Sequence, residues 1–509
     1  MFACAAFGFW GCDNYLKDDS GDLLVPKSVN EYIPLLYGEG YPRTFNSDVD
    51  FYAIITDDIQ TGTMEWDPES PWGTPNAGYD SDVAYAKWAY TWDYQMSANI
   101  SDKNWAARYA NILGCNTIIA ALDNMSYEES ESGKFNNLAA QAYTLRAYHY
   151  FCLVNSYALP WSAENLNEPG VVLRLSPEVM VDPIPRSTVG EVYKQINEDI
   201  IRAKGHMALA DPSTNKHLIS PDALLLLSTR ISLFQEKWDE VIADGEEFLR
   251  GNGSILNLNT VSDRLAYESE NPFYMMSLEE NPEIVFTFGT KPGVYPYAYM
   301  SSSGYEIGIR VSYEDEGSLI QTYEESDIRV KAYFVEDFYY PGNPYWGIPG
   351  YYEYQYYMPR KCDNTIYDTY RENWRTVEVL LNAAEAYARK DQAVSRGAID
   401  LINRLRVNRH YSGQYTALDV ADFTNRDALI KFIWDERRRE LCFEEAMRYW
   451  DLKRQGMPRI EHKFWTTTTT YETYVLKEGS PNYVMPIPGS ETEYNNAIVV
   501  NPREVINPS

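Results

Sequence analysis

The sequence predicts a mainly α-helical fold, a scaffold of stacked helix pairs interrupted by an irregular, aromatic-rich insertion with short strands. Three blocks, at about 81–157, 187–250 and 374–455, carry apolar residues at helical spacing. The segment 251–372, between the second and third blocks, is instead rich in Gly, Pro, Tyr and Glu. With 509 residues and 45% hydrophobic content, the chain can bury a substantial core.

The N-terminal segment has the pattern of an export leader. Residues 1–12 form an apolar run that is too short to span a bilayer. Gly11 before Cys12 resembles a bacterial lipoprotein cleavage site, so we expect residues 1–11 to be a signal peptide and Cys12 to carry lipid. Several acyl chains would anchor the protein stably to a membrane. Trp10 is bulky for such a site and no Lys or Arg precedes the run, so a signal peptide cut elsewhere or a frayed N-terminus is the alternative.

The first two helical blocks predict helices that need partners. Tyr143, Ala147, Tyr150 and Val154 follow one another at spacings of three and four, which predicts a one-sided apolar stripe. Ser187, followed by Glu191, is the expected N-cap of the second block.

Residues 224–234 and 238–248 predict two antiparallel helices separated by a short break. The pair resembles a tetratricopeptide unit, with Trp238 opening the second helix. The third block, at 374–390, 393–409 and 425–455, contains another such pair around Tyr387 and Ala398. Because stacked pairs bury each other's faces, we expect one scaffold and a single domain over 12–509, divided into 12–250, the insertion 251–372, and 373–509.

The insertion is the expected place for function. A stretch this long without helices inside a helical protein is a functional insertion by default, although 283–288 is typical of a strand. From 338 to 357, ten of the twenty residues are aromatic. For this cluster, an equally weighted alternative to a functional role is that the aromatic residues form a small satellite core that covers the scaffold.

A charged run begins at Asp435 and continues through the residues Glu436, Arg437, Arg438, Arg439 and Glu440. It lies within a predicted helix, so we interpret it as a buried ion-pair network in which guanidinium groups bridge neighbouring helices. Glu444 and Arg448, four residues apart, are expected to pair on one face. A structural role fits these residues better than an active site.

Composition excludes several classes of function. The net charge of −30 disfavours nucleic acid and other polyanionic ligands. The five histidines have no zinc spacing, and there is no phosphate loop, nucleophile elbow or dinucleotide fingerprint, so we expect no metal and no cofactor. Acidic neighbours such as Asp57 and Asp58 are expected to be solvated. Free buried thiols are expected at Cys115, Cys152 and Cys442, and Cys362 also lacks metal-like spacing.

Five motifs in order resemble those of the SusD/RagB family of outer-membrane lipoproteins. They are the early helix at 141–154, the helix pair at 224–248, the helices at 378–388 and 402–406, the charged helix at 435–454, and the closing segments at 485–491 and 501–502. The resemblance implies a SusD-like fold over nearly the whole mature chain.

The resemblance also implies a function. It predicts a lipid-anchored, surface-facing outer-membrane protein that captures oligosaccharides and delivers them to a SusC-like TonB-dependent transporter without catalysis. Lys17-Asp18-Asp19 resembles the surface-export signal of Bacteroidetes lipoproteins. A peptide-binding RagB-type member is the first alternative, since the anionic surface favours basic peptides, and a surface glycoside hydrolase is the second.

Exposed aromatic rings are the expected ligand contacts, because a sugar has an apolar face that stacks on Trp or Tyr. Two segments supply such rings outside helices: the Pro- and Gly-broken loop at 65–73, and the insertion. Packing that anchors the loop is the alternative for each Trp. The predicted contacts are Trp66, Trp72, Tyr295, Tyr297, Tyr299, Tyr345 and Trp346.

Overall fold

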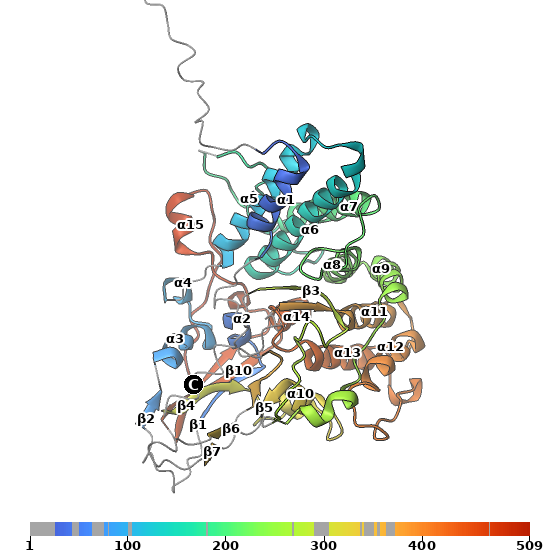
Figure 1. The fold of residues 1–509 in the computed structure, drawn as a ribbon. Helices are drawn as coiled ribbons and strands as arrows, with labels where there is room; N and C mark the ends of the chain where they lie inside the picture. The colour runs from blue at the N-terminus through green and yellow to red at the C-terminus, as the bar shows by residue number, and fades with distance from the viewer. Residues whose placement is uncertain are drawn as a thin grey trace, which may run out of the picture.

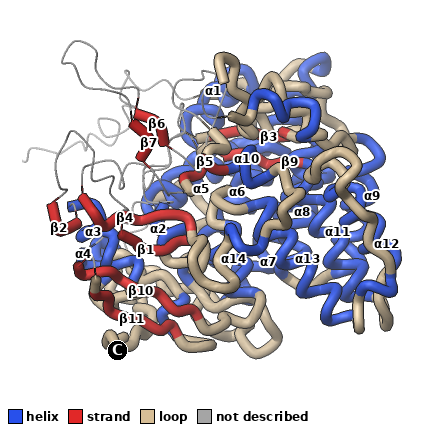
Figure 2. The backbone as a smooth tube through the Cα atoms, turned by 90° about the horizontal axis from the view of Figure 1, so that it is seen from below, coloured by secondary structure: helices blue, strands red, loops and turns tan. Residues whose placement is uncertain are grey.

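The computed structural model is mainly helical, with most of its strands on one side (Figures 1 and 2). None of the helices within the described ranges combines the length and hydropathy that crossing a membrane requires. The structure describes residues 26–42, 50–63, 76–79, 81–99, 104–179, 182–266, 269–289, 305–335, 338–340, 351–353, 357–362, 372–467 and 469–509.

Most helices match the three predicted blocks. Those before the insertion are α1 (Val29–Glu39), α2 (Asp50–Ile54), α3 (Ser81–Tyr90), α4 (Met96–Asn99), α5 (Asn104–Ala121), α6 (Ser132–Tyr157), α7 (Val189–Met207), α8 (Pro221–Phe234) and α9 (Trp238–Gly251). The later ones are α10 (Arg329–Tyr333), α11 (Thr376–Lys390), α12 (Arg396–Arg406), α13 (Arg426–Leu441), α14 (Met447–Arg454) and α15 (Gly489–Tyr494).

Helix α6 is more deeply buried than its stripe predicted. Every residue from Leu138 to Tyr157 is buried, not one face alone. Helices α5 and α7 flank it (Figure 1), and Arg146 within it pairs with Asp199 of α7 at 2.6 Å. The predicted N-cap is wrong by one residue, because Thr188 forms the capping box with Glu191.

The predicted helix pairs are confirmed. Ser220 caps α8 by accepting a hydrogen bond from the Ala223 N–H at 3.1 Å, and Trp238 opens α9. At the crossing of α9 and α11, a Cβ added at Gly245 would lie 3.3 Å from the Cβ of Ala383. The small residue therefore permits close packing of one pair on the next.

The predicted continuous helix at 425–455 is broken. Helix α13 ends at Leu441 and α14 begins at Met447. Between them, Phe443 (φ 59°) and Glu445 (φ 46°) adopt left-handed backbone, which residues with a Cβ rarely do. The break turns α14 into the centre of the molecule.

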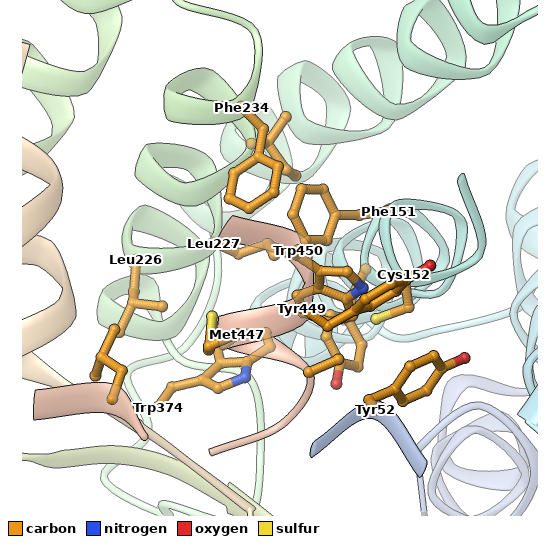
Figure 3. Close-up of a cluster of buried hydrophobic side chains, with 14 of the residues drawn as sticks. Tyr52, Phe151, Cys152, Leu226, Leu227, Phe234, Trp374, Met447, Tyr449 and Trp450 are labelled. Atoms are coloured by element: carbon orange, nitrogen blue, oxygen red, sulfur yellow. The ribbon is translucent and has the colours of Figure 1, made fainter. Parts of the chain in front are cut away.

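The core joins the two ends of the chain around α14 (Figure 3). Trp450 packs edge-on against Phe151 of α6, with ring centroids 5.5 Å apart, and Phe151 packs in the same way against Phe234 of α8 at 5.0 Å. Tyr449 stacks on Tyr52 of α2 at 5.2 Å. The helical scaffold and the C-terminal region therefore share one hydrophobic core.

The cysteine prediction is confirmed within the described residues, where Cys115, Cys152 and Cys442 are free and buried, and Cys362 is buried as well. Burial raises the pKa of Cys115 to about 12 and that of Cys442 to about 11. Both thiols are therefore protonated and unreactive at neutral pH.

The described strands form small separate sheets. A three-stranded sheet has the order β1 (Ile59–Thr63), β4 (Tyr305–Val311), β2 (Asn76–Tyr79). The two-stranded sheets pair β10 (Ile460–Thr467) with β11 (Thr470–Leu476), β3 (Ile284–Phe288) with β9 (Glu372–Arg375), β5 (Phe334–Val335) with β8 (Met358–Pro359), and β6 (Phe338–Tyr340) with β7 (Tyr351–Glu353).

Part of the insertion belongs to the core. Strand β3 confirms the predicted strand and is buried along its whole length. Its Phe286 packs edge-on against Trp374 of β9 at 4.9 Å. Within the aromatic cluster at 338–357, the ring of Tyr357 lies near Phe334 and Tyr313, and the other side chains of the cluster lie outside the described residues.

The charged run forms the predicted buried network. The carboxylate of Glu440 accepts hydrogen bonds from Arg329, Arg375 and Arg409 at 2.9 to 3.1 Å, and all four side chains are fully buried. The Tyr333 hydroxyl donates a further bond at 2.9 Å. Each of these partners comes from outside α13, so the network joins separate parts of the fold.

The predicted pair of Glu444 and Arg448 is wrong, because the helix breaks between α13 and α14. Glu444 instead binds Lys361 and Arg375, each at 2.6 Å. Arg448 binds Asp57 at 2.6 Å.

The prediction that Asp57 and Asp58 are solvated is also wrong for Asp58. Its side chain is buried, and its carboxylate accepts a hydrogen bond from Arg438 at 2.7 Å. Asp57 and Asp58 together therefore anchor the turn after α2 to the C-terminal helices, through Arg448 of α14 and Arg438 of α13.

Candidate binding site

The predicted ligand contacts lie outside the described residues. Trp66 and Trp72 belong to 64–75, and Tyr295, Tyr297 and Tyr299 belong to 290–304. The same is true of Tyr345 and Trp346, in 341–350, and of the predicted lipidation site Cys12. The structure nevertheless describes the strands from which these segments begin and to which they return.

The three-stranded sheet brings two of the segments together. Strand β1 leads into 64–75 and pairs antiparallel with β4, so that Thr63 lies opposite Ile307. Strand β2 follows 64–75 and runs parallel to β4, with Asn76 opposite Tyr305, the first residue after 290–304. Three of the four ends of these segments therefore lie close together, at the same end of a single sheet.

The third segment is bracketed by a strand pair. Tyr340, the last residue of β6, lies opposite Tyr351, the first residue of β7. Residues 341–350 thus leave and re-enter the described structure at one place. In both Figures 1 and 2 this pair lies on the side of the molecule that holds β1, β2 and β4, away from the helix pairs.

A hollow of about 390 Å³ lies beside the same sheet, between β1 and β10. We refer to it as the β1–β10 hollow. Its volume is sufficient for a small ligand or for one unit of a longer one. The polar and aromatic residues that line it include Gln60, Thr61, Tyr90, Glu314, Asp315, Glu461, His462, Lys463 and Trp465.

Hydrogen bonds hold β10 against β1 and shape this hollow. The Thr61 hydroxyl donates to the Lys463 carbonyl at 2.5 Å and accepts from the Trp465 N–H at 3.2 Å. The Tyr90 hydroxyl accepts from the Thr61 N–H at 3.0 Å and donates to the same Lys463 carbonyl at 3.2 Å. Tyr90, Thr61 and Trp465 are therefore fixed relative to one another.

His462 supports the floor of the β1–β10 hollow. Its ring stacks between Tyr90 and Trp92, with centroid distances of 4.1 and 4.2 Å. Burial lowers the pKa of His462 to about 4, although its nitrogens face the carbonyls of Tyr90 at 2.7 Å and Thr56 at 3.0 Å. The ring is thus neutral at pH 7, which suits a packing role better than proton transfer.

The lining of the hollow includes residues with buried polar groups that lack a protein partner in the described part of the chain. Among the described residues, the Nε2 of Gln60 and the indole N–H of Trp465 are buried without a hydrogen-bond partner. Lys463 and Asp315 form an ion pair at 2.9 Å on the outer side. Such a mixed lining can donate to and accept from hydroxyl groups.

Sequence reasoning missed this hollow. Its local signal is weak: Trp465 and Tyr471 flank a Thr-rich hairpin turn, which predicts two strands but no partner for them. The residues that complete the hollow, such as Gln60 and Tyr90, are distant in sequence. Within the described residues, no cluster of His, Cys, Asp and Glu is placed to hold a metal.

Two family models match the chain, one before the insertion and one that begins within it. One, described as starch-binding associating with outer membrane, matches residues 40–233, and the other, of the SusD family, matches residues 310–503. The chain belongs to the SusD/RagB family. Membership inferred from the five motifs is thereby confirmed. SusD proteins are non-catalytic binding proteins, so the prediction that this chain is not an enzyme is confirmed with it.

Individual SusD relatives agree with the predicted fold. A SusD-like protein of Formosa agariphila is 26% identical over 78% of this chain and 79% of its own length. A solved SusD superfamily protein of Bacteroides thetaiotaomicron has a TM-score of 0.66 at 18% identity, covering 94% of this chain and 100% of that one. A solved laminarin-binding SusD-like protein has a TM-score of 0.60 at 19% identity, covering 94% and 99%. The mainly helical SusD-like fold is thus confirmed.

Proposed function

We propose that this protein captures a neutral oligosaccharide outside the cell and delivers it to a SusC-like TonB-dependent transporter, held to the outer membrane by lipid on Cys12. The observation that carries the proposal is the register of the β1–β4–β2 sheet, since it gathers the ends of two aromatic segments beside a polar hollow. The outer-membrane association of the family and the laminarin-binding relative support it.

The chemistry of the segments matches that of a sugar chain. Trp66, Trp72 and Trp346 offer flat rings for the apolar faces of successive sugar units. The β1–β10 hollow offers the Gln60 amide and the Trp465 indole N–H for hydroxyl groups. The net charge of −30 disfavours acidic glycans, so a neutral chain is the expected ligand.

The first test replaces the predicted stacking rings. Isothermal titration with laminarihexaose, maltohexaose and other neutral oligosaccharides is expected to find a ligand, and Trp72→Ala or Trp346→Ala is expected to weaken it about tenfold, since one stacking ring contributes roughly 1.4 kcal/mol. Tyr127→Ala is the matched control, because Tyr127 is 45% exposed on the segment before α6. Unchanged affinity in both Trp variants would refute the assignment of the rings.

The second test uses salt to separate sugar from peptide. Binding of a neutral oligosaccharide is expected to change less than about twofold as salt rises from about 0.05 M to about 0.5 M, because no net charge is screened. A basic peptide attracted by the anionic surface should instead lose affinity steeply. Capture of a cationic peptide with such a loss, and of no sugar, would favour the RagB-type alternative.

A further inference from the structure

A second hollow, also of about 390 Å³, lies between α5, the loop that follows α6, and α15. We refer to it as the α5–α15 hollow. In Figure 1, α15 stands beside the upper helices, well above β1, β2 and β4. The residues that matter for its chemistry are Trp105, Tyr109, Asn116, Arg174, Asp182 and Tyr494.

The floor of the α5–α15 hollow is aromatic and rigid. Trp105 is 1% exposed and packs edge-on against Tyr157 at 4.9 Å and at a tilt against Tyr109 at 5.0 Å. The Tyr109 hydroxyl donates to the Val172 carbonyl at 2.8 Å, which fixes the loop over the floor. These contacts preform an apolar surface at the base.

One polar group on this floor has no protein partner. The indole N–H of Trp105 is buried and makes no hydrogen bond to any described residue. Leaving a buried donor unpaired costs about 1–3 kcal/mol. An oxygen acceptor from a ligand in the hollow would satisfy it.

The walls combine charges of both signs with amides. Asn116 accepts from Arg146 at 2.9 Å and donates to the Arg174 carbonyl at 2.8 Å, so it positions the loop that carries the Arg174 guanidinium. Asp182 and Glu491 supply carboxylates. A ligand with a single kind of charge would meet repulsion on one side, whereas hydroxyl groups can both donate and accept.

The mouth of the hollow carries an exposed ring. Tyr494, at the end of α15, is 88% exposed, which leaves its faces free for contact. This amphipathic ring adds nothing to the core and is available to a ligand.

We propose that the α5–α15 hollow is a second carbohydrate site, which takes one neutral sugar unit with an oxygen on the Trp105 indole N–H and a ring face on Tyr494. It is separate from the site proposed beside the β1–β4–β2 sheet and does not need Trp72 or Trp346. Two sites on one protein raise the effective concentration of a long glycan at either site.

The test observes Trp105 directly. The full chain is labelled with ¹⁵N at its Trp indoles, and Trp105→Phe identifies the resonance. Titration with laminarihexaose, maltohexaose and cellohexaose is expected to shift this resonance with at least one probe. The shift should persist in a Trp72→Ala/Trp346→Ala double variant, and Tyr494→Ala should weaken the corresponding Kd about tenfold. Tyr127→Ala should leave it unchanged.

The outcomes separate this inference from the proposed function. A Trp105 resonance that responds to no probe overturns the second site, whether or not the loop variants affect other binding. A response that disappears in the double variant also overturns it, because a single site would then explain all binding. A response to tri-lysine but to no sugar would refute the ligand class. A response without any effect of the loop variants would uphold the second site and refute the first.

Discussion

Replacing Glu440 with Gln is expected to lower the free energy of unfolding by about 3–5 kcal/mol, because it removes the charge that neutralises buried guanidinium groups. Arg329, Arg375 and Arg409 all donate to this carboxylate, and none of the side chains is exposed. Urea denaturation followed by circular dichroism measures the change.

The matched control is an ion pair on the surface. Asp239 pairs with Lys390 where the carboxylate is 82% exposed, so Asp239→Asn should cost less than about 1 kcal/mol. Equal losses in the two variants would show that the buried network contributes no more than a surface pair. A double variant, Glu440→Met with Arg409→Met, should lose less free energy of unfolding than the sum of the two single changes. Each single change leaves the other residue as a buried charge without this partner, whereas the double change removes both charges.

Acid is expected to unfold the protein through the same network. Burial by itself would raise the pKa of Glu440, but Arg409 and Arg375 outweigh it and hold that pKa well below the ordinary value. The pKa of Glu436 is likewise held low, by Arg329 and Arg439 against the effect of burial. In the unfolded chain both carboxyl groups return to a pKa of about 4.3.

The direction of the pH effect follows from these shifts. Between the folded and unfolded pKa values the unfolded state binds more protons, so stability rises with pH. The contribution of both groups is complete above about pH 5 and is lost as the pH falls toward their folded pKa values. Asp58 and Asp199, whose pKa burial raises, act in the opposite direction.

Unfolding free energies measured from pH 7 down to pH 3 test this expectation. The wild type should lose stability steeply below about pH 4.5, and Glu440→Gln should show a shallower slope because one of the titrating groups is gone. A slope that is identical in the two proteins would mean that Glu440 does not contribute to acid unfolding.

The sequence predicted the local structure of the scaffold well. Apolar spacing predicted the helix pair, and Trp238 marked the start of α9, because periodicity is a property of neighbouring residues. The start predicted for α8, at Leu224, is late, since the Ser220 cap and Pro221 begin the helix earlier. The break after Leu441 was missed, since Phe443 and Glu445 adopt left-handed backbone without the Gly that usually signals it.

The candidate site could be predicted only in part. The aromatic segments stand out in the sequence because Trp, Pro and Gly are local signals. The β1–β10 and α5–α15 hollows were missed, because each combines residues from distant parts of the chain, such as Tyr90 with Lys463 and Trp105 with Tyr494.

The sequence by itself determined the helical scaffold, the family and the buried nature of the charged run, because helical period, motif order and charge spacing are written in consecutive residues. Only the tertiary structure decided which arginines neutralise Glu440 and that the strand after Asp58 pairs with the one beginning at Tyr305. The physical reason is that ion pairs and strand register join residues distant in sequence, 31 positions apart for Arg409 and Glu440 and 252 for Ile59 and Val311, and nothing in either local sequence specifies the partner.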